Sequence, residues 1–301
     1  PERWWGPGWE GSLVLSTNAR PVPQMALERL FPEPFDVRGL RWIGPWSLST
    51  FMGELDDERS VNGARLFGMR FTMKPAPDLE LGFVRTAQWC GEGRPCDLGA
   101  FGDLLIGRDN RGVNVEAEQE PGNQLAGMDV RWSSPWGTRP YALYFQWIGE
   151  DTRQGGPQIG SWLRQGGVEF WGRLGDWRQR THVEFADTVC QEGGFGFGGP
   201  KYRCAYEHSV YRTGYRYRGR VIGHGVEGDA RVSSVGSMWT RAGGATWNAL
   251  LSRADLNERA ASTNTLTTVA RTLTELHVSR EQGFGFGTLR GGIGFQRLSG
   301  G

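Results

Sequence analysis

Tyrosine and arginine residues crowd into one stretch of this sequence, between residues 202 and 217. A tyrosine ring offers a flat apolar face with a hydroxyl at its edge, and a guanidinium holds a carboxylate in two-point contacts. The stretch is therefore a candidate ligand surface, and its members are Tyr202, Arg203, Tyr206, Tyr211, Arg212 and Tyr215. The alternative is an interfacial girdle, because tyrosine and tryptophan also collect where a membrane meets water.

A second candidate is the acidic stretch 91–123. It contains Asp103, Asp109 and Asn110, whose side-chain oxygens accept hydrogen bonds. Long loops on a rigid scaffold often carry function, so we treat these three residues as possible ligand contacts. The alternative is an ordinary solvated loop.

A third candidate set is Glu184 and Asp187, with His182 two residues before Glu184. Alternation puts His182 and Glu184 on one face of a strand, opposite Val183 and Phe185. Acidic groups on such a face could bind a ligand. The alternative is structural pairing with nearby arginines, which are Arg173, Arg178 and Arg180.

The same acids raise the question of hydrolysis. His182 with Glu184 or Asp187 would supply a base and its orienting group, but no GxSxG nucleophile motif is present. A glycosidase needs two carboxylates, and Glu54 with Asp56 or Asp57 is an unspecific match. We therefore expect no enzyme, and keep a hydrolase as an alternative.

Four cysteines fall into two local pairs, Cys90 with Cys96 and Cys190 with Cys204. Local pairing is the simplest of the three possible connectivities, and disulfides are typical of the periplasm or the cell surface. Neither pair is CxxC and no histidine lies at finger-like spacing, so we expect no metal and no cofactor.

The composition is unusual for a soluble domain. Hydrophobic residues make up 38% and the mean hydropathy is −0.48, yet the chain has 14 Trp, 15 Phe and 47 Gly. Few aliphatic and many aromatic residues suit a β-barrel with a thin apolar band and a wet interior. The 34 basic and 33 acidic residues nearly cancel, which gives no support to nucleic-acid binding.

Apolar and polar residues alternate from end to end, as in Phe67–Met73 and Tyr141–Trp147. Because their neighbours along the strand are charged or small, seven aromatic residues are expected to face lipid: Phe67, Phe71, Phe83, Tyr141, Phe145, Phe170 and Phe185. The pattern predicts a single all-β domain over residues 1–301, a transmembrane antiparallel up-and-down β-barrel with about fourteen strands in this chain. The expected strands are 11–19, 23–31, 40–55, 64–75, 79–90, 124–134, 138–149, 164–174, 177–188, 209–221, 229–241, 244–253, 266–281 and 285–297. Residues 98–106 are expected to form a short helix within a loop.

The links between these strands predict the two ends of the barrel. Three long links, 91–123, 150–163 and 189–208, should share one end, which we expect to be extracellular because such barrels have short periplasmic turns. Both cysteine pairs then lie in outer loops. The last strand should run to the opposite end, provided that 209–221 is a strand.

The ends of the sequence and its tryptophans give further expectations. The chain has no run of 18 apolar residues, so we expect no transmembrane helix; a barrel needs no such run, because alternate residues face the lipid. The sequence begins at Pro1, so we expect a mature or trimmed product. The tryptophans Trp4, Trp5 and Trp9 are expected to pack the start of the barrel.

Several motifs resemble the Wzi family of capsule assembly proteins, in family order along most of the chain. They are Arg3-Trp4-Trp5-Gly6-Pro7-Gly8, Ser12–Pro21, Leu81–Gln88, Asp109-Asn110, Gly127–Arg131, His182–Thr188 and Gly214–His224. The resemblance implies a lectin-like barrel in the outer membrane of a Gram-negative bacterium, which binds capsular polysaccharide or exopolysaccharide and helps attach it to the cell surface.

The resemblance also implies binding partners and a barrel larger than the one this chain forms. Its partners would be the polysaccharide, outer-membrane lipid and the polysaccharide export machinery. The family barrel has about eighteen strands and a helical bundle, so we expect an N-terminal part to be missing here. An outer-membrane porin and an outer-membrane hydrolase stay open as alternative functions.

Overall fold

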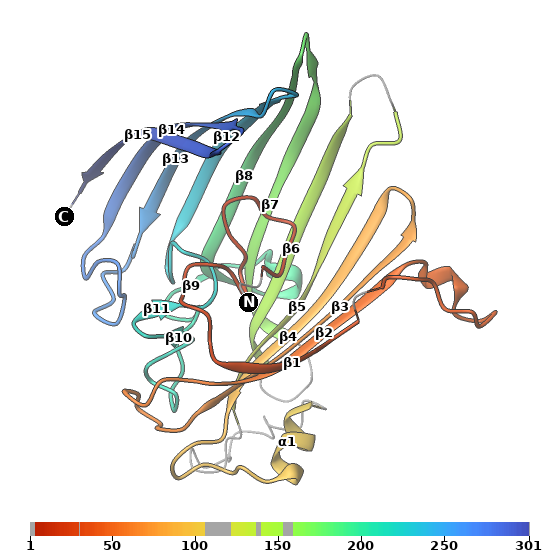
Figure 1. Cartoon of the computed structure of the whole chain (residues 1–301). Helices are drawn as coiled ribbons and strands as arrows, with labels where there is room; N and C mark the ends of the chain where they lie inside the picture. Colours follow the sequence, from red (N-terminus) through yellow and green to blue (C-terminus); the bar gives the residue numbers. More distant parts are fainter. Residues whose placement is uncertain (1–3, 30, 106–121, 137–139, 153–158, 301) are drawn as a thin grey trace.

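Long antiparallel strands make up most of the computed structural model, which describes residues 4–29, 31–105, 122–136, 140–152 and 159–300 (Figure 1). One 13-stranded sheet runs in the order β1-β2-β3-β4-β5-β6-β7-β8-β12-β13-β14-β15, with β9 beside β8, and β10 and β11 form a separate hairpin. The strands are β1 Gln24–Glu28, β2 Trp46–Glu54, β3 Arg65–Ala76, β4 Leu79–Trp89, β5 Gly122–Ser133, β6 Tyr141–Thr152, β7 Ile159–Leu174, β8 Trp177–Glu192, β9 Pro200–Lys201, β10 Arg216–Tyr217, β11 Arg220–Val221, β12 Arg231–Arg241, β13 Ala245–Leu256, β14 Arg271–Phe284 and β15 Gly287–Ser299. The predicted all-β antiparallel fold is confirmed.

Two of the expected strands do not form. Residues 11–19 contain no strand, and 209–221 contribute only the short hairpin β10–β11. Three consecutive apolar residues, Leu13, Val14 and Leu15, are all buried, which a strand with one wet face would not allow. Both segments instead fold against the sheet, and their backbones meet where Ser16 N donates to Ile222 O at 3.0 Å.

The sheet has an inner and an outer face. We call the side that contacts residues 4–22 the inner face; these residues, the N-terminal segment, lie in front of the middle strands in Figure 1. The inner face carries buried polar groups such as Gln146 and Glu184, and the outer face carries exposed apolar ones such as Phe83 and Phe170. Predicted outward residues Phe71, Tyr141 and Phe145 are half-buried there, and Phe185 is exposed.

One predicted outward residue, Phe67, is covered. The helix α1, Leu98–Leu105, lies in the link after β4, as expected, and its Phe101 packs edge-on against Phe67 with ring centroids 5.3 Å apart. Phe67 is therefore buried, so the prediction that it faces lipid is wrong.

Helices are a minor part of the fold. In the part of the chain that the structure describes, the other helices are the 3-10 turns η1 Arg41–Ile43 and η3 Gly194–Gly196. No helix in the described part of the chain is long and apolar enough to cross a membrane.

The long links gather at one end of the sheet, as predicted. The links after β4, β6 and β8 leave from strands that run in the same direction. The last strand ends there too, because Ser299 lies beside Thr272, and Thr272 lies beside Asp255 at the far end of β13. The expectation that it runs to the opposite end is wrong, because 209–221 does not cross the sheet.

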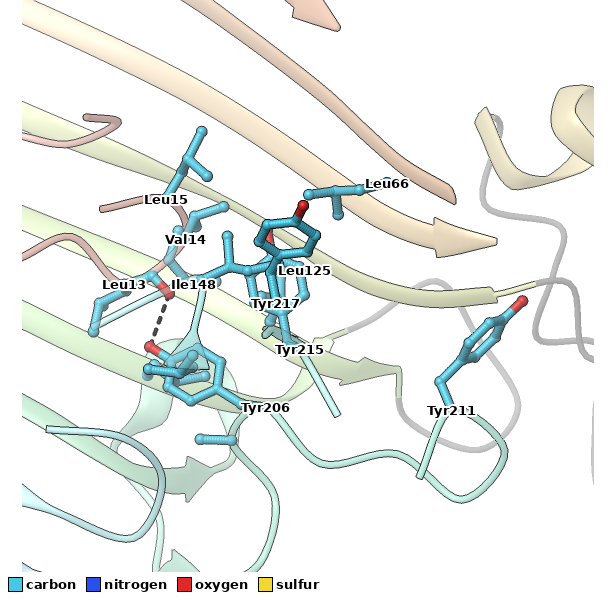
Figure 2. Close-up of a cluster of buried hydrophobic side chains, with 14 of the residues drawn as sticks. Leu13, Val14, Leu15, Leu66, Leu125, Ile148, Tyr206, Tyr211, Tyr215 and Tyr217 are labelled. Carbon is cyan, nitrogen blue, oxygen red and sulfur yellow. Dashed lines mark hydrogen bonds between the residues drawn. The ribbon is translucent and has the colours of Figure 1, made fainter. Parts of the chain in front are cut away.

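A hydrophobic core fills the space between the inner face and two segments of the chain. The segments are the N-terminal segment and residues 193–230, here called the β8–β12 loop. The core residues labelled in Figure 2 come from both segments and from strands β3, β5 and β6: Leu13, Val14, Leu15, Leu66, Leu125, Ile148, Tyr206, Tyr211, Tyr215 and Tyr217. This core fixes the β8–β12 loop on the sheet and so determines which of its residues reach solvent.

Candidate functional site

Three of the predicted ligand residues belong to the core. Tyr206, Tyr211 and Tyr215 are at most 1% exposed. The hydroxyl of Tyr206 donates to Leu13 O at 2.9 Å, the bond drawn in Figure 2, and the hydroxyl of Tyr211 donates to Cys90 O at 3.1 Å. Their rings present no face to a ligand in this structure. The correction has a physical reason: a loop that folds inward needs large side chains with a polar tip to pack it.

The other members of that cluster lie at the surface. Arg203 and Arg212 are exposed, and Tyr202 is half-buried with its hydroxyl donating to Glu258 at 3.1 Å. Arg259 lies over the ring of Tyr202, with its guanidinium carbon 4.6 Å from the ring centroid. Arg203 and Arg212 therefore remain free to meet a ligand, whereas Tyr202 is partly covered.

A polar pocket of about 440 Å³ opens beside Arg203. We call it the rim pocket, because it lies at the end of the sheet where the long links gather. It is lined by Lys201, Arg203, Cys204, Glu207, His208, Ser209, Ala261, Ser262 and Thr263. One wall is the β8–β12 loop and the other is the link between β13 and β14. No sequence motif predicts that these two segments lie side by side.

Both cysteine pairs form the predicted disulfides, Cys90–Cys96 and Cys190–Cys204. The second joins the end of β8 to the β8–β12 loop beside the rim pocket. Both lie at the end of the long links, as predicted, and they stabilise the segments from which that end is built.

The three candidate residues from the stretch 91–123 are not shown to form one site. Asp103 is exposed on α1, and Asp109 and Asn110 lie outside the described residues. Nothing in the described structure brings Asp103 to the rim pocket. Among the described residues, no group of histidine, cysteine or acidic side chains could hold a metal ion.

Glu184 holds the N-terminal segment on the inner face. Its buried carboxylate accepts hydrogen bonds from Trp9 N at 2.7 Å, Glu10 N at 3.0 Å, Tyr144 Oη at 2.8 Å and Gln165 Nε2 at 3.0 Å. Its hydrogen-bond partners in this structure are backbone amides and neutral side chains, not the arginines Arg173, Arg178 or Arg180 that the alternative expected. Its oxygens are fully occupied.

Asp187 is also structural. It accepts from Arg164 at 2.9 Å and from Val189 N at 3.0 Å, lies 3.5 Å from Arg231, and is 1% exposed. Neither carboxylate is placed to act on a substrate.

The tight approach of the N-terminal segment explains its glycines. A Cβ atom at Gly8 would overlap the amide of Gln165, and one at Gly11 would overlap the ring of His224. Trp5 is buried, and Trp9 stacks on His182 with ring centroids 4.9 Å apart. Packing of these two tryptophans was expected, whereas Trp4 is exposed.

Together these features define a class of protein. A curved antiparallel sheet with an apolar outer face, a polar inner face and an interior filled by its own chain has the architecture of an outer-membrane β-barrel. The comparisons with known proteins narrow the class. The model of the capsule assembly protein Wzi family matches residues 1–299, so the chain belongs to that family.

Two relatives give the scale of the similarity. A Klebsiella pneumoniae protein described as "Uncharacterized 55.8 kDa protein in cps region" is 37% identical over 187 residues, which cover 62% of this chain and 36% of that protein. The solved structure of Wzi matches with a TM-score of 0.84 and 26% identity, over 99% of this chain and 62% of that one. That protein is described as an outer membrane protein involved in group 1 capsule assembly in Escherichia coli and as a carbohydrate-binding β-barrel. The chain thus spans less than two thirds of either relative.

Proposed function

We propose that this chain forms part of a lectin-like outer-membrane β-barrel, in a Gram-negative bacterium, that binds capsular polysaccharide or exopolysaccharide and helps attach it to the cell surface. The observation that carries the proposal is the match of 99% of the chain to a barrel described as carbohydrate-binding. The proposed role is binding, not catalysis, and needs no cofactor. Outer-membrane lipid and the polysaccharide export machinery are the further partners we propose.

The rim pocket is the proposed surface for the polymer. Lys201 and Arg203 on its wall are cationic, and Arg212 is exposed on the same loop. Guanidinium groups bind carboxylates in two-point contacts, which suits a polymer with acidic sugars. Each contact is weak, but a repeating polymer can engage many copies of the protein, so avidity supplies retention.

A porin is the weaker alternative. The inner face is packed by the N-terminal segment and the β8–β12 loop, whose contacts leave Leu13, Ile148 and Tyr206 buried. An interior filled in this way favours a lumen that is blocked to ions and other solutes. We expect little ion conductance in planar bilayers, and a large steady conductance would favour the porin.

Binding by the purified protein tests the proposal. Arg203→Gln with Arg212→Gln should weaken binding of acidic capsular polysaccharide by about tenfold, because two charge-assisted contacts are lost. Arg290→Gln with Arg297→Gln, on exposed positions of β15, is the matched control and should bind like the parent. Heat-modifiable migration on gels reports assembly of each variant. A parent protein that binds no polysaccharide would overturn the proposal.

A further inference from the structure

A second cavity lies at the opposite end of the sheet from the disulfides. Its volume is about 750 Å³, and four of its lining residues are arginines: Arg131, Arg173, Arg178 and Arg180. Among the described residues of the lining, Glu169 is the one carboxylate. Its lining comes from the ends of β5, β7, β8 and β12 on this side of the sheet, and from Pro140. Four cations against one anion leave a strong positive field in a hollow with protein walls.

Two of these arginines are fixed in place. Glu169 is fully buried and accepts from Arg131 at 2.8 Å, from Arg180 Nε at 2.7 Å and from Trp9 Nε1 at 3.3 Å. Arg180 also lies over the ring of Trp9, with its guanidinium carbon 4.8 Å from the centroid. Glu169 therefore neutralises part of this charge and holds both guanidiniums at the cavity wall.

The other two arginines lack such a partner. Arg173 and Arg178 are directly opposite each other in the β7–β8 ladder, and both are exposed. Neither has an acidic partner among the described residues. Like charges in register destabilise a pair of strands, so this arrangement costs free energy in the empty protein. An anion between the two guanidiniums would remove that cost.

An aromatic ring adjoins the unpaired arginines. Trp171 lines the cavity, lies two residues before Arg173 and pairs in register with Arg180. An indole offers a flat apolar face to the C–H side of a sugar ring. The combination of a ring face and a guanidinium fork fits a ligand that has both a pyranose ring and a carboxylate.

We propose that this cavity is a second binding site, for a carboxylate-bearing saccharide, with the carboxylate between Arg173 and Arg178 and the sugar ring against Trp171. The inference rests on the proposed function only in that the ligand is a saccharide. It concerns the end of the sheet opposite the rim pocket, so each site can be changed without touching the other.

The test uses the full chain, purified in detergent, and titration calorimetry with trigalacturonate. Arg173→Gln with Arg178→Gln should weaken binding by about tenfold or more, and Trp171→Leu should weaken it while leaving both guanidiniums. The control is again Arg290→Gln with Arg297→Gln, which removes the same charge from β15. Added salt should weaken binding by the parent, because the attraction is electrostatic.

Other probes separate the outcomes. Neutral trigalactose should bind far more weakly than trigalacturonate. Inorganic phosphate that displaces trigalacturonate as well as free galacturonate does would overturn the saccharide assignment and leave a general anion site. Equal binding by the parent and by the assembled Arg173/Arg178 variant would overturn the site itself. The proposed function is tested separately, by polysaccharide binding to the Arg203/Arg212 variant.

Discussion

A single carboxylate, Glu184, joins the N-terminal segment to the inner face. Alternation in the sequence predicts that it faces inward, because Val183 and Phe185 on either side face outward. Its backbone donors Trp9 N and Glu10 N lie about 175 residues away in the chain, and no local pattern identifies them. The sequence therefore predicts on which face of the strand Glu184 lies, whereas its hydrogen-bond partners can be identified only from the tertiary structure.

Replacing Glu184 by Ala should release the N-terminal segment. The change leaves buried donors unpaired, each at a cost of about 1–3 kcal/mol, so the free energy of unfolding should fall by several kcal/mol. Limited proteolysis should cut within residues 4–22 of the variant before it cuts the parent. Glu54→Ala, at an exposed position, is the control; equal protection of both variants would contradict this role.

His224 should make stability depend on pH. Burial lowers the pKa of this imidazole from 6.5 to about 4, and its Nε2 has no hydrogen-bond partner among the described residues. The folded state therefore prefers neutral histidine, so its contribution is complete above pH 6.5 and is lost as the pH falls from 6.5 towards 4. Between pH 7.5 and 5.0 the loss should be about 2 kcal/mol. Urea unfolding at both pH values should show that His224→Gln loses this much less than the parent; an equal loss would contradict it.

At the scale of elements, regular strands were predictable and inward-folding segments were not. Strands β2 to β8 and β12 to β15 all appear in the sequence as alternating stretches. Residues 11–19 and 209–221 have an apolar content similar to that of the strands, but their side chains pack into an interior core rather than on a face of the sheet. The tyrosines there looked like a binding surface because burial depends on contacts with distant strands, which composition does not encode.

The disulfide Cys190–Cys204 should stabilise the β8–β12 loop. Its cysteines are 14 residues apart, and closing a loop of that size stabilises a fold by about 3 kcal/mol. Cys190→Ser with Cys204→Ser should lower the free energy of unfolding by about that amount and increase hydrogen exchange around Tyr206. Loss of the shorter Cys90–Cys96 disulfide should leave exchange at Tyr206 unchanged, and the reverse pattern would contradict this assignment.

The outer face should tolerate no charge in its middle. Phe145 lies in β6 on that face, and an arginine there would cost about 2–4 kcal/mol if the face contacts lipid. Phe145→Arg should therefore assemble poorly in lipid bilayers, as reported by heat-modifiable migration. Phe286→Arg, in the short turn before β15, is the control. Equal assembly of both variants would show that the outer face does not meet lipid.

The two ends of the sheet carry different features of the molecule. The disulfides, the rim pocket and the long links share one end, and the arginine-lined cavity lies at the other. Between them the N-terminal segment and the β8–β12 loop fill the inner face. This arrangement fits a barrel that holds a polymer at its surface better than one that conducts solutes. The family motifs made this overall architecture predictable, but the positions of both pockets depend on how the loops fold.

The proposed role in holding capsule at the cell surface can be measured as capsule retention by living cells. Cells with and without the gene are stained for surface polysaccharide, and polymer released into the medium is measured in parallel. We predict that cells without the gene make as much polymer but release most of it, and that returning the gene restores the attached capsule. Normal attachment of capsule in cells that lack the gene would contradict the proposed function.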